Sequence, residues 1–504
     1  MPLRLGSCDQ FARVEESLRA AGFNEAGVCR ALKVAEIGDL SRGIPKSIDL
    51  SNASPRLALF IRLFMFLESL PRAEVEQGLD QATLNSFLAL DLVRPEGDDA
   101  EHYCSPIFLY PVAGLLIASD HYKSRDGSAF RPPPDAVLPA IYAGTIRFLR
   151  VISRSPAEEV LDLCAGSGVG ALMLSRHVKR AVATDITPRA AHFAAFNRML
   201  NRCHNVEIAR GDLYDPVAGR TFDRIVAHPP YVPSVRGDLI YRDAGETGEV
   251  LVHRTIEGLI QHLRPGGTFY CVTRGLDTKA RPFEERARLW LGPSHHEFDV
   301  IFAYDSEISP REVIRNIAEK DGSLEPPDII RLERTFDEME ATRMVYGALV
   351  IHRHAGRSEP WTARTRLSQI TDGPGFEWAF RWRRWSTRPG AVEALKRLRP
   401  RLSPHLRLVV THEVQESVLK PTSFTCESDW PFRTTTVVDY GAMSVIAGFN
   451  GERTIAEVHQ SLRENGALSE AVAVDDFAGA VAMFIERGLL AVDDSIFDDL
   501  EDAR

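Results

Sequence analysis

The sequence lacks several features that would place it quickly in a class of protein. Its seven cysteines are scattered and include no Cys-x-x-Cys pair, which argues against a disulfide framework and a zinc site. The N-terminus has no apolar core of the signal-peptide type, and no apolar run is long enough to span a bilayer. There is no internal repeat and no low-complexity tract. We therefore expect a cytoplasmic protein with reduced thiols, no metal site and no membrane partner.

The chain also has no excess of positively charged residues. The chain has 60 Lys and Arg against 70 Asp and Glu, which gives a formal net charge of −10. This balance disfavours a general nucleic-acid binder, although a local basic face could exist within it. The apolar and charged fractions are those of a globular protein, and the 504 residues suffice for about two to four domains.

The first 123 residues predict a mainly helical domain. Apolar residues recur at helical spacing, and short strand-like pieces follow around Leu92, 103–109 and 114–118. Helices followed by a small hairpin suggest a winged-helix-like unit, which is either a cap over an active site or a nucleic-acid binder; the charge balance favours the cap. The expected helices are 9–33, 57–70, 73–79 and 82–90.

A break in the pattern separates this domain from the next. Gly127 and three prolines at 132–134 predict a linker over 124–134. A helix is expected over 136–151, and strands then alternate with helices to about residue 355. This alternation predicts a largely parallel, doubly wound sheet with ligands at the C-terminal ends of its strands. The expected strands are 160–163, 180–184, 206–209, 224–227, 268–272, 299–303 and 344–352, and the expected helices are 171–177, 188–201, 250–263, 283–291 and 310–319.

A glycine-rich turn follows the first of these strands. The stretch Val160-Leu-Asp-Leu-Cys-Ala-Gly-Ser-Gly-Val-Gly-Ala-Leu172 places Gly166, Gly168 and Gly170 where the chain turns and a helix begins. Glycine allows a tight turn and the close approach of a ligand, and the amides at the helix start can bind that ligand. The spacing suits either a dinucleotide or S-adenosylmethionine.

Three acids accompany the turn. Asp162 lies inside the first strand, where it can accept hydrogen bonds from loop amides or, through water, from a ligand's ammonium group. Asp185 ends the second strand and is placed for a bidentate bond to ribose hydroxyls. Asp212 follows the third strand and could accept from an adenine amino group.

This succession of features resembles the class I S-adenosylmethionine-dependent methyltransferases over roughly residues 135–355. A Rossmann dehydrogenase, the alternative, would carry Gly-x-Gly-x-x-Gly instead of the Gly-x-Gly-x-Gly found here. The resemblance implies an α/β fold with a Rossmann-like, seven-stranded, mostly parallel sheet, and S-adenosyl-L-methionine as the cofactor. The residues it implies for cofactor binding are Asp162, Ala165, Gly166, Gly168, Gly170, Asp185, Ile186, Asn197, Asp212 and Leu213.

The fourth strand ends in His228-Pro229-Pro230-Tyr231. This resembles the Asn/Asp/Ser-Pro-Pro-Tyr/Phe motif of methyltransferases that act on exocyclic amino groups of adenine or guanine, or on the side-chain amide of glutamine. Such a nitrogen is a poor nucleophile because its lone pair is delocalised. The first side chain and the first proline's carbonyl accept hydrogen bonds from its N–H groups and so orient the nitrogen. The prolines stiffen the loop, and this positioning supplies most of the rate enhancement.

His228 departs from that motif. A neutral imidazole accepts one hydrogen bond at its unprotonated nitrogen, and it could also act as a general base with a pKa near neutrality. The departure leaves open another acceptor such as a hydroxyl, an altered substrate, or a protein that binds the cofactor without catalysis. A plain strand-ending turn is a further interpretation of these residues.

The segment after the motif is similar to the release-factor glutamine methyltransferases and their "methyltransferase small domain" relatives. Those enzymes carry Tyr/Phe-x-Asp-Gly-Gly-x-x-Gly, and this chain has Tyr241-Arg-Asp-Ala-Gly245 followed by Gly248, with Ala244 replacing a glycine. We expect this loop to close over the site, with Tyr241, Arg242 and Asp243 as substrate contacts. The alternative is that Arg242 and Asp243 cap the helix that begins near Glu249.

The composition changes after about residue 355. Five of the six tryptophans lie beyond residue 360, and the Trp/Arg run 377–385 could stack on bases or form an aromatic contact between domains. The segment 434–492 loosely resembles PqqD-type modules, which bind peptides by strand addition. The alternative is a structural domain that packs on the core or forms a homodimer. The expected strands are 406–414 and 434–439, and the expected helices are 442–449, 455–464 and 475–487.

We therefore expect an N-terminal helical, winged-helix-like domain at 1–123, a methyltransferase domain at 135–355, and a C-terminal α+β, winged-helix-like domain at 356–504. The expected function is methyl transfer to an amide or amino nitrogen of a protein or peptide. An adenine or guanine of RNA is the alternative acceptor.

Overall fold

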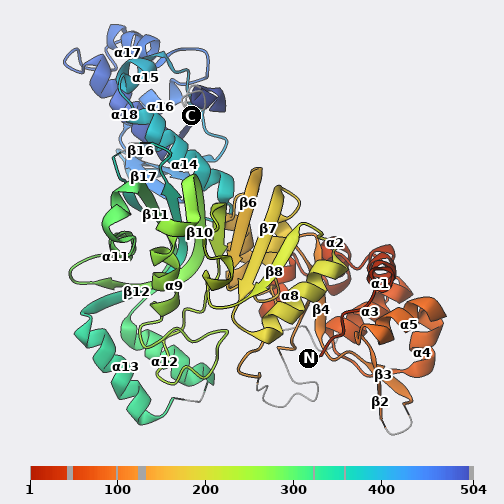
Figure 1. The fold of residues 1–504 in the computed structure, drawn as a ribbon. Coiled ribbons are helices and arrows are strands. Elements are labelled where there is room, and N and C mark those ends of the chain that lie inside the picture. Colours follow the sequence, from red (N-terminus) through yellow and green to blue (C-terminus); the bar gives the residue numbers. More distant parts are fainter. Residues whose placement is uncertain are drawn as a thin grey trace. The chain divides into compact units, whose positions relative to one another are not determined.

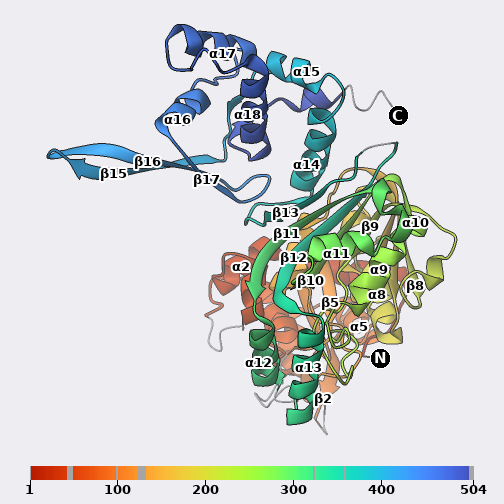
Figure 2. The same ribbon diagram turned by 90° about the vertical axis from the view of Figure 1, so that its left-hand side faces the viewer.

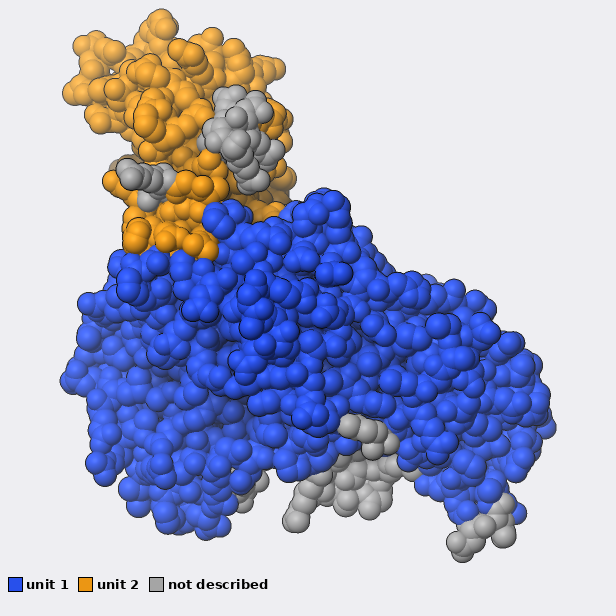
Figure 3. All heavy atoms as spheres, viewed as in Figure 1, with its two compact units in different colours: residues 1–149, 154–295, 307–346 blue, residues 150–153, 296–306, 347–504 orange. Residues whose placement is uncertain are grey.

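The computed structural model describes residues 2–42, 49–97, 100–122, 132–321, 324–356 and 359–498. Most of the predicted linker, at 124–131, lies outside these residues, as does the end of the acidic tail. The chain divides into two compact units (Figure 3). The first consists of Met1–Leu149, Arg154–His295 and Glu307–Tyr346, and the second of Arg150–Ser153, His296–Ser306 and Gly347–Arg504. None of the helices within the described ranges is long and apolar enough to cross a membrane.

The N-terminal helices are shorter than predicted. The single helix expected over 9–33 is wrong, because Gly22 turns the chain with a φ of +79° and the Asn24 side chain then caps a second helix. The helix expected over 57–70 ends at Phe60 and continues as one π-helical turn to Met65. The helix pair predicted at 73–79 and 82–90 is confirmed. The helices are α1 (Cys8–Ala20), α2 (Glu25–Leu32), α3 (Pro55–Phe60), α4 (Arg72–Gly78) and α5 (Gln81–Ala89).

Two small sheets complete this region. The hairpin of β4 and β5 is buried along its whole length. Two asparagine side chains at the end of helix α8 (Pro188–Leu200) bond its backbone, since Asn197 and the C-cap residue Asn201 accept from the amides of Ala118 and Leu116. A hairpin buried in this way favours the cap interpretation over a nucleic-acid-binding wing. The strands are β1 (Leu70–Pro71), β2 (Arg94–Glu96), β3 (His102–Cys104), β4 (Phe108–Val112) and β5 (Leu115–Ser119).

The predicted α/β class and mostly parallel central sheet are confirmed. Among the described residues the sheet has eight strands in the order β13-β11-β12-β10-β9-β6-β7-β8. Figure 1 shows β6, β7 and β8 of this sheet side by side. The predicted count of seven is wrong because β13, a polar strand, pairs parallel with β11. The strand order reverses at β6, which lies between β7 and β9, and such a switch point favours a ligand site. The strands are β6 (Ala157–Leu163), β7 (Val178–Asp185), β8 (Val206–Arg210), β9 (Phe222–Ala227), β10 (Leu263–Thr278), β11 (Phe298–Ile308), β12 (Ala341–Arg353) and β13 (Thr362–Arg366).

The helices of the first unit follow the predicted alternation with three differences. The single helix expected over 250–263 is divided at Gly258 into α9 and α10. The helix expected over 136–151 begins only at Ala143, since Pro139 disfavours helical backbone in the residue before it. Helix α13, which was not predicted, packs with α12 through Val313, Ile317, Leu332 and Phe336. The helices are α6 (Ala143–Val151), α7 (Val169–Leu174), α8 (Pro188–Leu200), α9 (Val250–Glu257), α10 (Leu259–His262), α11 (Phe283–Leu289), α12 (Pro310–Asp321) and α13 (Pro326–Glu338).

The second unit contains the tryptophan-rich helix and a three-stranded sheet of order β15-β16-β17. Trp378, Trp382 and Trp385 are at most 7% exposed, and neighbouring rings stack along α14 at 5.7 and 5.6 Å. Buried ring faces cannot stack on bases, so that interpretation of the run 377–385 is wrong. Strand β16 was not predicted. The elements are α14 (Gly373–Ser386), α15 (Ala391–Arg397), β14 (Arg401–Leu402), β15 (Leu406–Gln415), β16 (Val418–Ser428), β17 (Thr434–Val438), α16 (Tyr440–Ala447), α17 (Ile455–Glu464), α18 (Val474–Glu486) and β18 (Leu490–Ala491).

Candidate active site

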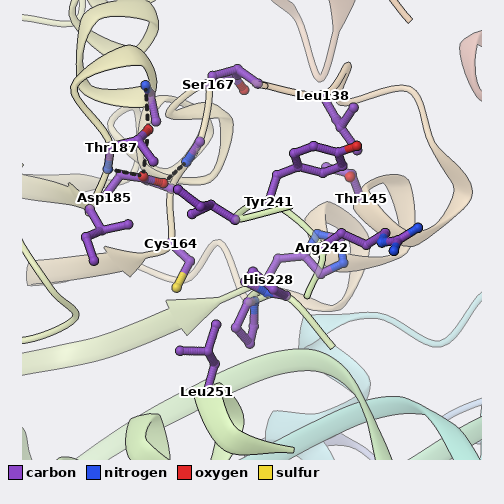
Figure 4. Close-up of a pocket in the computed structure, with 18 of the residues that line it drawn as sticks. Leu138, Thr145, Cys164, Ser167, Asp185, Thr187, His228, Tyr241, Arg242 and Leu251 are labelled. Atoms are coloured by element: carbon purple, nitrogen blue, oxygen red, sulfur yellow. Dashed lines mark hydrogen bonds between the residues drawn. The ribbon is translucent and has the colours of Figure 1, made fainter. Parts of the chain in front are cut away.

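A cavity of about 700 Å³ lies at the C-terminal ends of β6, β7 and β9. In Figure 4, Asp185 and Thr187 lie on one side of it, and His228, Tyr241 and Arg242 lie on the other. It is lined by most of the residues singled out from the sequence, namely Asp162, Ala165, Gly166, Gly170, Asp185, Ile186, Asp212, Leu213, His228, Pro229, Pro230, Tyr231, Tyr241, Arg242 and Asp243.

The glycine turn has the geometry that a close ligand requires. Gly166 has a φ of +53°, and no atom lies within 4 Å of the position a Cβ would occupy. Gly170 has no such room, because a Cβ there would lie 2.6 Å from Oδ2 of Asp162. The same Oδ2 accepts a hydrogen bond of 2.8 Å from the amide of Ala171. Burial raises the pKa of the Asp162 carboxyl to about 7.

The carboxylate of Asp185, the last residue of β7, is hydrogen-bonded to the glycine turn. Its Oδ2 accepts from the amide of Gly166 at 2.9 Å, and its Oδ1 accepts from the amide and hydroxyl of Thr187 at 3.0 and 3.3 Å. Burial raises the pKa of this carboxyl, and these hydrogen bonds oppose the rise. Asp185 also lines the cavity, so its carboxylate borders the space that a ligand hydroxyl would occupy.

Asp212 has a partner that the sequence did not suggest. Its Oδ2 lies 2.8 Å from Nη2 of Arg254 on α9, and both residues line the cavity. The pair therefore places a fixed positive and a fixed negative charge at the end of the cavity nearest β8.

Two residues expected at the cofactor lie outside the cavity wall. Gly168 precedes α7 with a φ of +80°, and a Cβ there would lie 3.1 Å from that of Ala194. The Asn197 side chain bonds the amide and carbonyl of Ala118 and the carbonyl of Ser167. Asn197 thus holds the β4–β5 hairpin to the glycine turn instead of facing the cavity, which corrects its expected place.

His228 is a buried side chain in the cavity wall. Its ring stacks on Phe148 of α6, with centroids 5.4 Å apart and planes 19° apart. Burial and, to a smaller extent, the charge of Arg147 lower the pKa of the imidazole to about 4. Its Nε2 is buried and has no hydrogen-bond partner within the described residues. A neutral ring nitrogen is therefore left without a partner, which costs about 1–3 kcal/mol until a ligand or water supplies one.

A cluster of aromatic and cationic side chains packs against Tyr231 of the His-Pro-Pro-Tyr motif. The Tyr231 ring lies 5.6 Å from that of Tyr346 on β12. The guanidinium of Arg147 lies over Tyr346 at 5.1 Å, and that of Arg274 lies over both tyrosines at 5.6 and 5.9 Å. Gly144 leaves room for these rings, since a Cβ there would lie 2.8 Å from Oη of Tyr346. The sequence did not point to this cluster, because it joins segments far apart along the chain.

The loop after the motif is held in shape by Asp243. One carboxylate oxygen accepts from the Ser234 hydroxyl and the Leu239 amide at 3.0 and 3.1 Å, and the other accepts from Nε of Arg242 at 2.9 Å. Arg242 and Asp243 do not cap α9, so that alternative is wrong. Glu249 stands at that position, buried and paired with Arg286 at 2.8 Å.

Helix α13 anchors the outer part of this loop. Arg236 lies 2.7 Å from Asp328, and Arg331 lies 2.6 Å from Glu246. The Thr335 hydroxyl also donates to Glu246, at 2.5 Å. These bonds join the loop to the helical insertion between β11 and β12, so the insertion helps to position Tyr241 and Arg242 at the cavity.

Comparison with known proteins points to one family. The family model "Methyltransferase small domain" matches residues 140–282. The ribosomal protein uL3 glutamine methyltransferase of Bradyrhizobium diazoefficiens is 33% identical over 159 residues, which cover 29% of this chain and 50% of that protein. The release factor glutamine methyltransferase of Koribacter versatilis is 31% identical over 153 residues, 28% of this chain and 52% of that protein.

The chain spans about half the length of these curated relatives. Among solved structures, the ribosomal protein L11 methylase of Lactobacillus delbrueckii subsp. bulgaricus aligns with 40% of this chain and 71% of its own, at 19% identity and a TM-score of 0.23. The matched segment 140–282 contains the glycine turn, Asp185, the His-Pro-Pro-Tyr loop and the loop that follows it. Residues 140–282 of this chain therefore match the methyltransferase small domain family, and the curated relatives named above are methyltransferases.

Proposed function

We propose that the chain catalyses methyl transfer from S-adenosylmethionine to an amide or amino nitrogen of a protein or peptide. The observation that supports this most directly is that one cavity contains both sets of residues that such a reaction needs. The glycine turn and Asp185 lie on one side, and the His228–Tyr231 loop lies on the other.

The cavity suits the cofactor in its donor set. Gly166 leaves open space beside the backbone, and Asp185 lines the same cavity, where its carboxylate would accept from a ribose hydroxyl. Asp162, with a raised pKa, gains a charge partner when a cationic ligand binds nearby. When bound, S-adenosylmethionine supplies an electrophilic methyl group on a sulfonium ion.

His228 and the carbonyl of Pro229 are the proposed acceptors for the substrate's N–H groups. With its pKa lowered, the imidazole is neutral at neutral pH and offers one lone pair. It orients the substrate nitrogen by accepting a hydrogen bond, and it holds a proton only weakly. Tyr231 supports the planar group, and its own position is held by Tyr346 and Arg274. Positioning of this kind can supply a large part of a rate enhancement.

The side-chain amide of glutamine is the proposed acceptor group. The relatives are named as glutamine methyltransferases of ribosomal protein uL3 and of release factors. We propose the same acceptor group for this chain because residues 140–282 match the methyltransferase small domain. His228 is the residue at which the substrate specificity would differ from that of the relatives. The cytoplasm is the proposed compartment, since all seven cysteines are unpaired.

Methyl-labelled cofactor tests this function. The protein is incubated with a cell lysate and the labelled cofactor, and the products are separated into protein, RNA and small-molecule fractions. Label in the protein fraction supports the proposal. Label in RNA would move the acceptor to a base, and tight cofactor binding without label in any fraction would indicate a protein that binds the cofactor without catalysis. Loss of label on replacing His228 by Ala ties the transfer to this cavity.

A further inference from the structure

The second unit carries an exposed β-ribbon. Strands β15 and β16 pair antiparallel from Leu406↔Ser428 to Gln415↔Val418, whereas β17 pairs with Phe424–Ser428 of β16. Figure 2 shows the remaining two-stranded part extending away from α16, α17 and α18 of the same unit. Val414 and Leu419, which face each other near its tip, are 73% and 65% exposed.

The outer edge of β15 is unpaired among the described residues, since β15 is the first strand of its sheet. Proteins usually protect such an edge with proline, a bulge, a short strand or an inward-pointing charge. Strand β15 is ten residues long and contains no proline. The one irregularity in the register leaves Thr422 of β16 without an opposite residue, so β15 itself is regular. Such an edge is suited to pairing with another strand.

The charge pattern of β15 indicates that the strand pairing with this edge is β15 of a second copy of the chain. Two copies of β15 can pair antiparallel about a twofold axis through Val410. This register places Arg407 of each copy opposite Glu413 of the other, Val409 opposite Thr411, and Leu406 opposite Val414. Moving the axis by one residue, to Val409 or to Thr411, leaves both charges without an opposite charge. The strand is therefore self-complementary in one register.

We propose that two copies of this chain associate by antiparallel pairing of their β15 edges in the register that opposes Arg407 to Glu413. The two ribbons then form one continuous sheet. A nucleic-acid partner is disfavoured, because the ribbon has two basic residues, Arg407 and Lys420, against three acidic ones, Glu413, Glu416 and Glu427. The proposal is independent of the methyl-transfer reaction.

Reciprocal charge variants of the full chain test the register. Sedimentation velocity over a concentration series gives the dimer dissociation constant of the wild type, E413R and R407E. In each variant two opposite-charge pairs become like-charge pairs, so the dissociation constant should rise by about tenfold. An equimolar mixture of E413R and R407E should dimerise again, because each Arg then faces a Glu in the heterodimer. E416R is the matched control, since this register places residue 416 opposite the uncharged Pro404, and its dimer should be unchanged.

Arg407 also pairs with Glu427 of its own ribbon, so R407E alone could weaken the ribbon without weakening a dimer. Restored association in the mixture excludes that cause. Amide exchange provides a second measurement, and alternate β15 amides should become protected as wild-type concentration rises. A wild type that stays monomeric at about 100 μM, a dimer that E413R leaves unchanged, or a mixture that does not recover would overturn the proposal.

Discussion

The imidazole of His228 lies flat against the ring of Phe148, with the centroids 5.4 Å apart. Phe148 belongs to α6, the helix that begins just after the cavity-lining segment at 135–142, and His228 directly follows β9. The contact fixes the plane of the ring in the cavity wall and removes it from water. The properties of the proposed acceptor site follow from this contact and from the charges around it.

The first prediction concerns pH. Only neutral His228 can accept the substrate's hydrogen bond, and its pKa is lowered from 6.5 to about 4. At saturating cofactor, where the bound cation holds Asp162 as the carboxylate, lowering the pH from 8 to 6 should therefore leave the imidazole neutral and produce no inflection near 6.5 in the rate of methyl transfer. The groups that face the ring are Arg147, Phe148 and Tyr231, with Arg274 and Tyr346 behind Tyr231.

An NMR titration of the His228 ring measures this directly, and R147Q is the informative variant. Without the guanidinium charge, the midpoint should move upwards, while burial keeps it below 6.5. An inflection near 6.5 in the wild type would show that the ring is not held neutral in this way.

The second prediction concerns Asp162. Its carboxyl has a pKa of about 7, so it is about half protonated at pH 7 before a ligand binds. A cationic cofactor stabilises the carboxylate and should expel the remaining proton. The binding enthalpy at pH 7 should then vary with the ionisation enthalpy of the buffer, and D162N should abolish this variation. Equal buffer dependence in D162N and wild type would assign the proton to another group.

The third prediction concerns Asp185. Replacing it by Asn keeps the shape but removes the charge, so cofactor affinity should fall by roughly tenfold to a hundredfold. Isothermal titration calorimetry with S-adenosylhomocysteine, the demethylated cofactor, provides the measurement. D337N, at an exposed position on α13, is the control and should bind as the wild type does. Unchanged affinity in D185N would mean that the ribose site lies elsewhere.

The fourth prediction concerns Gly144. A methyl group there would lie 2.8 Å from Oη of Tyr346 and 3.4 Å from Oη of Tyr231, so G144A should displace the Pro-Pro-Tyr loop. We expect methyl transfer to fall by about tenfold or more, with cofactor affinity nearly unchanged. G479A in α18, where a Cβ meets nothing within 4 Å, should leave transfer unchanged and raise the melting temperature slightly. Equal rates of methyl transfer in G144A and wild type would show that packing against Tyr346 and Tyr231 does not position the Pro-Pro-Tyr loop.

The sequence predicted those parts of the fold in which local pattern and tertiary structure agree. The buried strands β6, β7 and β9 are apolar runs with turn residues after them, so their positions were evident. Strand β13 (Thr-Ala-Arg-Thr-Arg) has no apolar alternation and forms because β11 offers an edge. Strand β16 also lacks a regular apolar alternation, and its first five residues are exposed.

The site was predictable to the extent that its residues stand at strand ends. Asp162, Asp185, Asp212 and His228 each lie near or just after the C-terminal end of a parallel strand, and such ends meet at one edge of a sheet. Asn197 was misplaced because its partner, the β4–β5 hairpin, is distant in sequence. Arg147, Arg274 and Tyr346 were missed for the same reason, since no motif joins α6, β10 and β12.

The most direct test of the central claim is to identify the methylated atom. Protein labelled by the wild type is digested completely by proteases, and its amino acids are separated and analysed by mass spectrometry. The account predicts that the label lies on a side-chain nitrogen, with N-methylglutamine as the expected product, and that H228A yields none. Label on a hydroxyl, thiol or carboxyl oxygen, or label that persists in H228A, would contradict it.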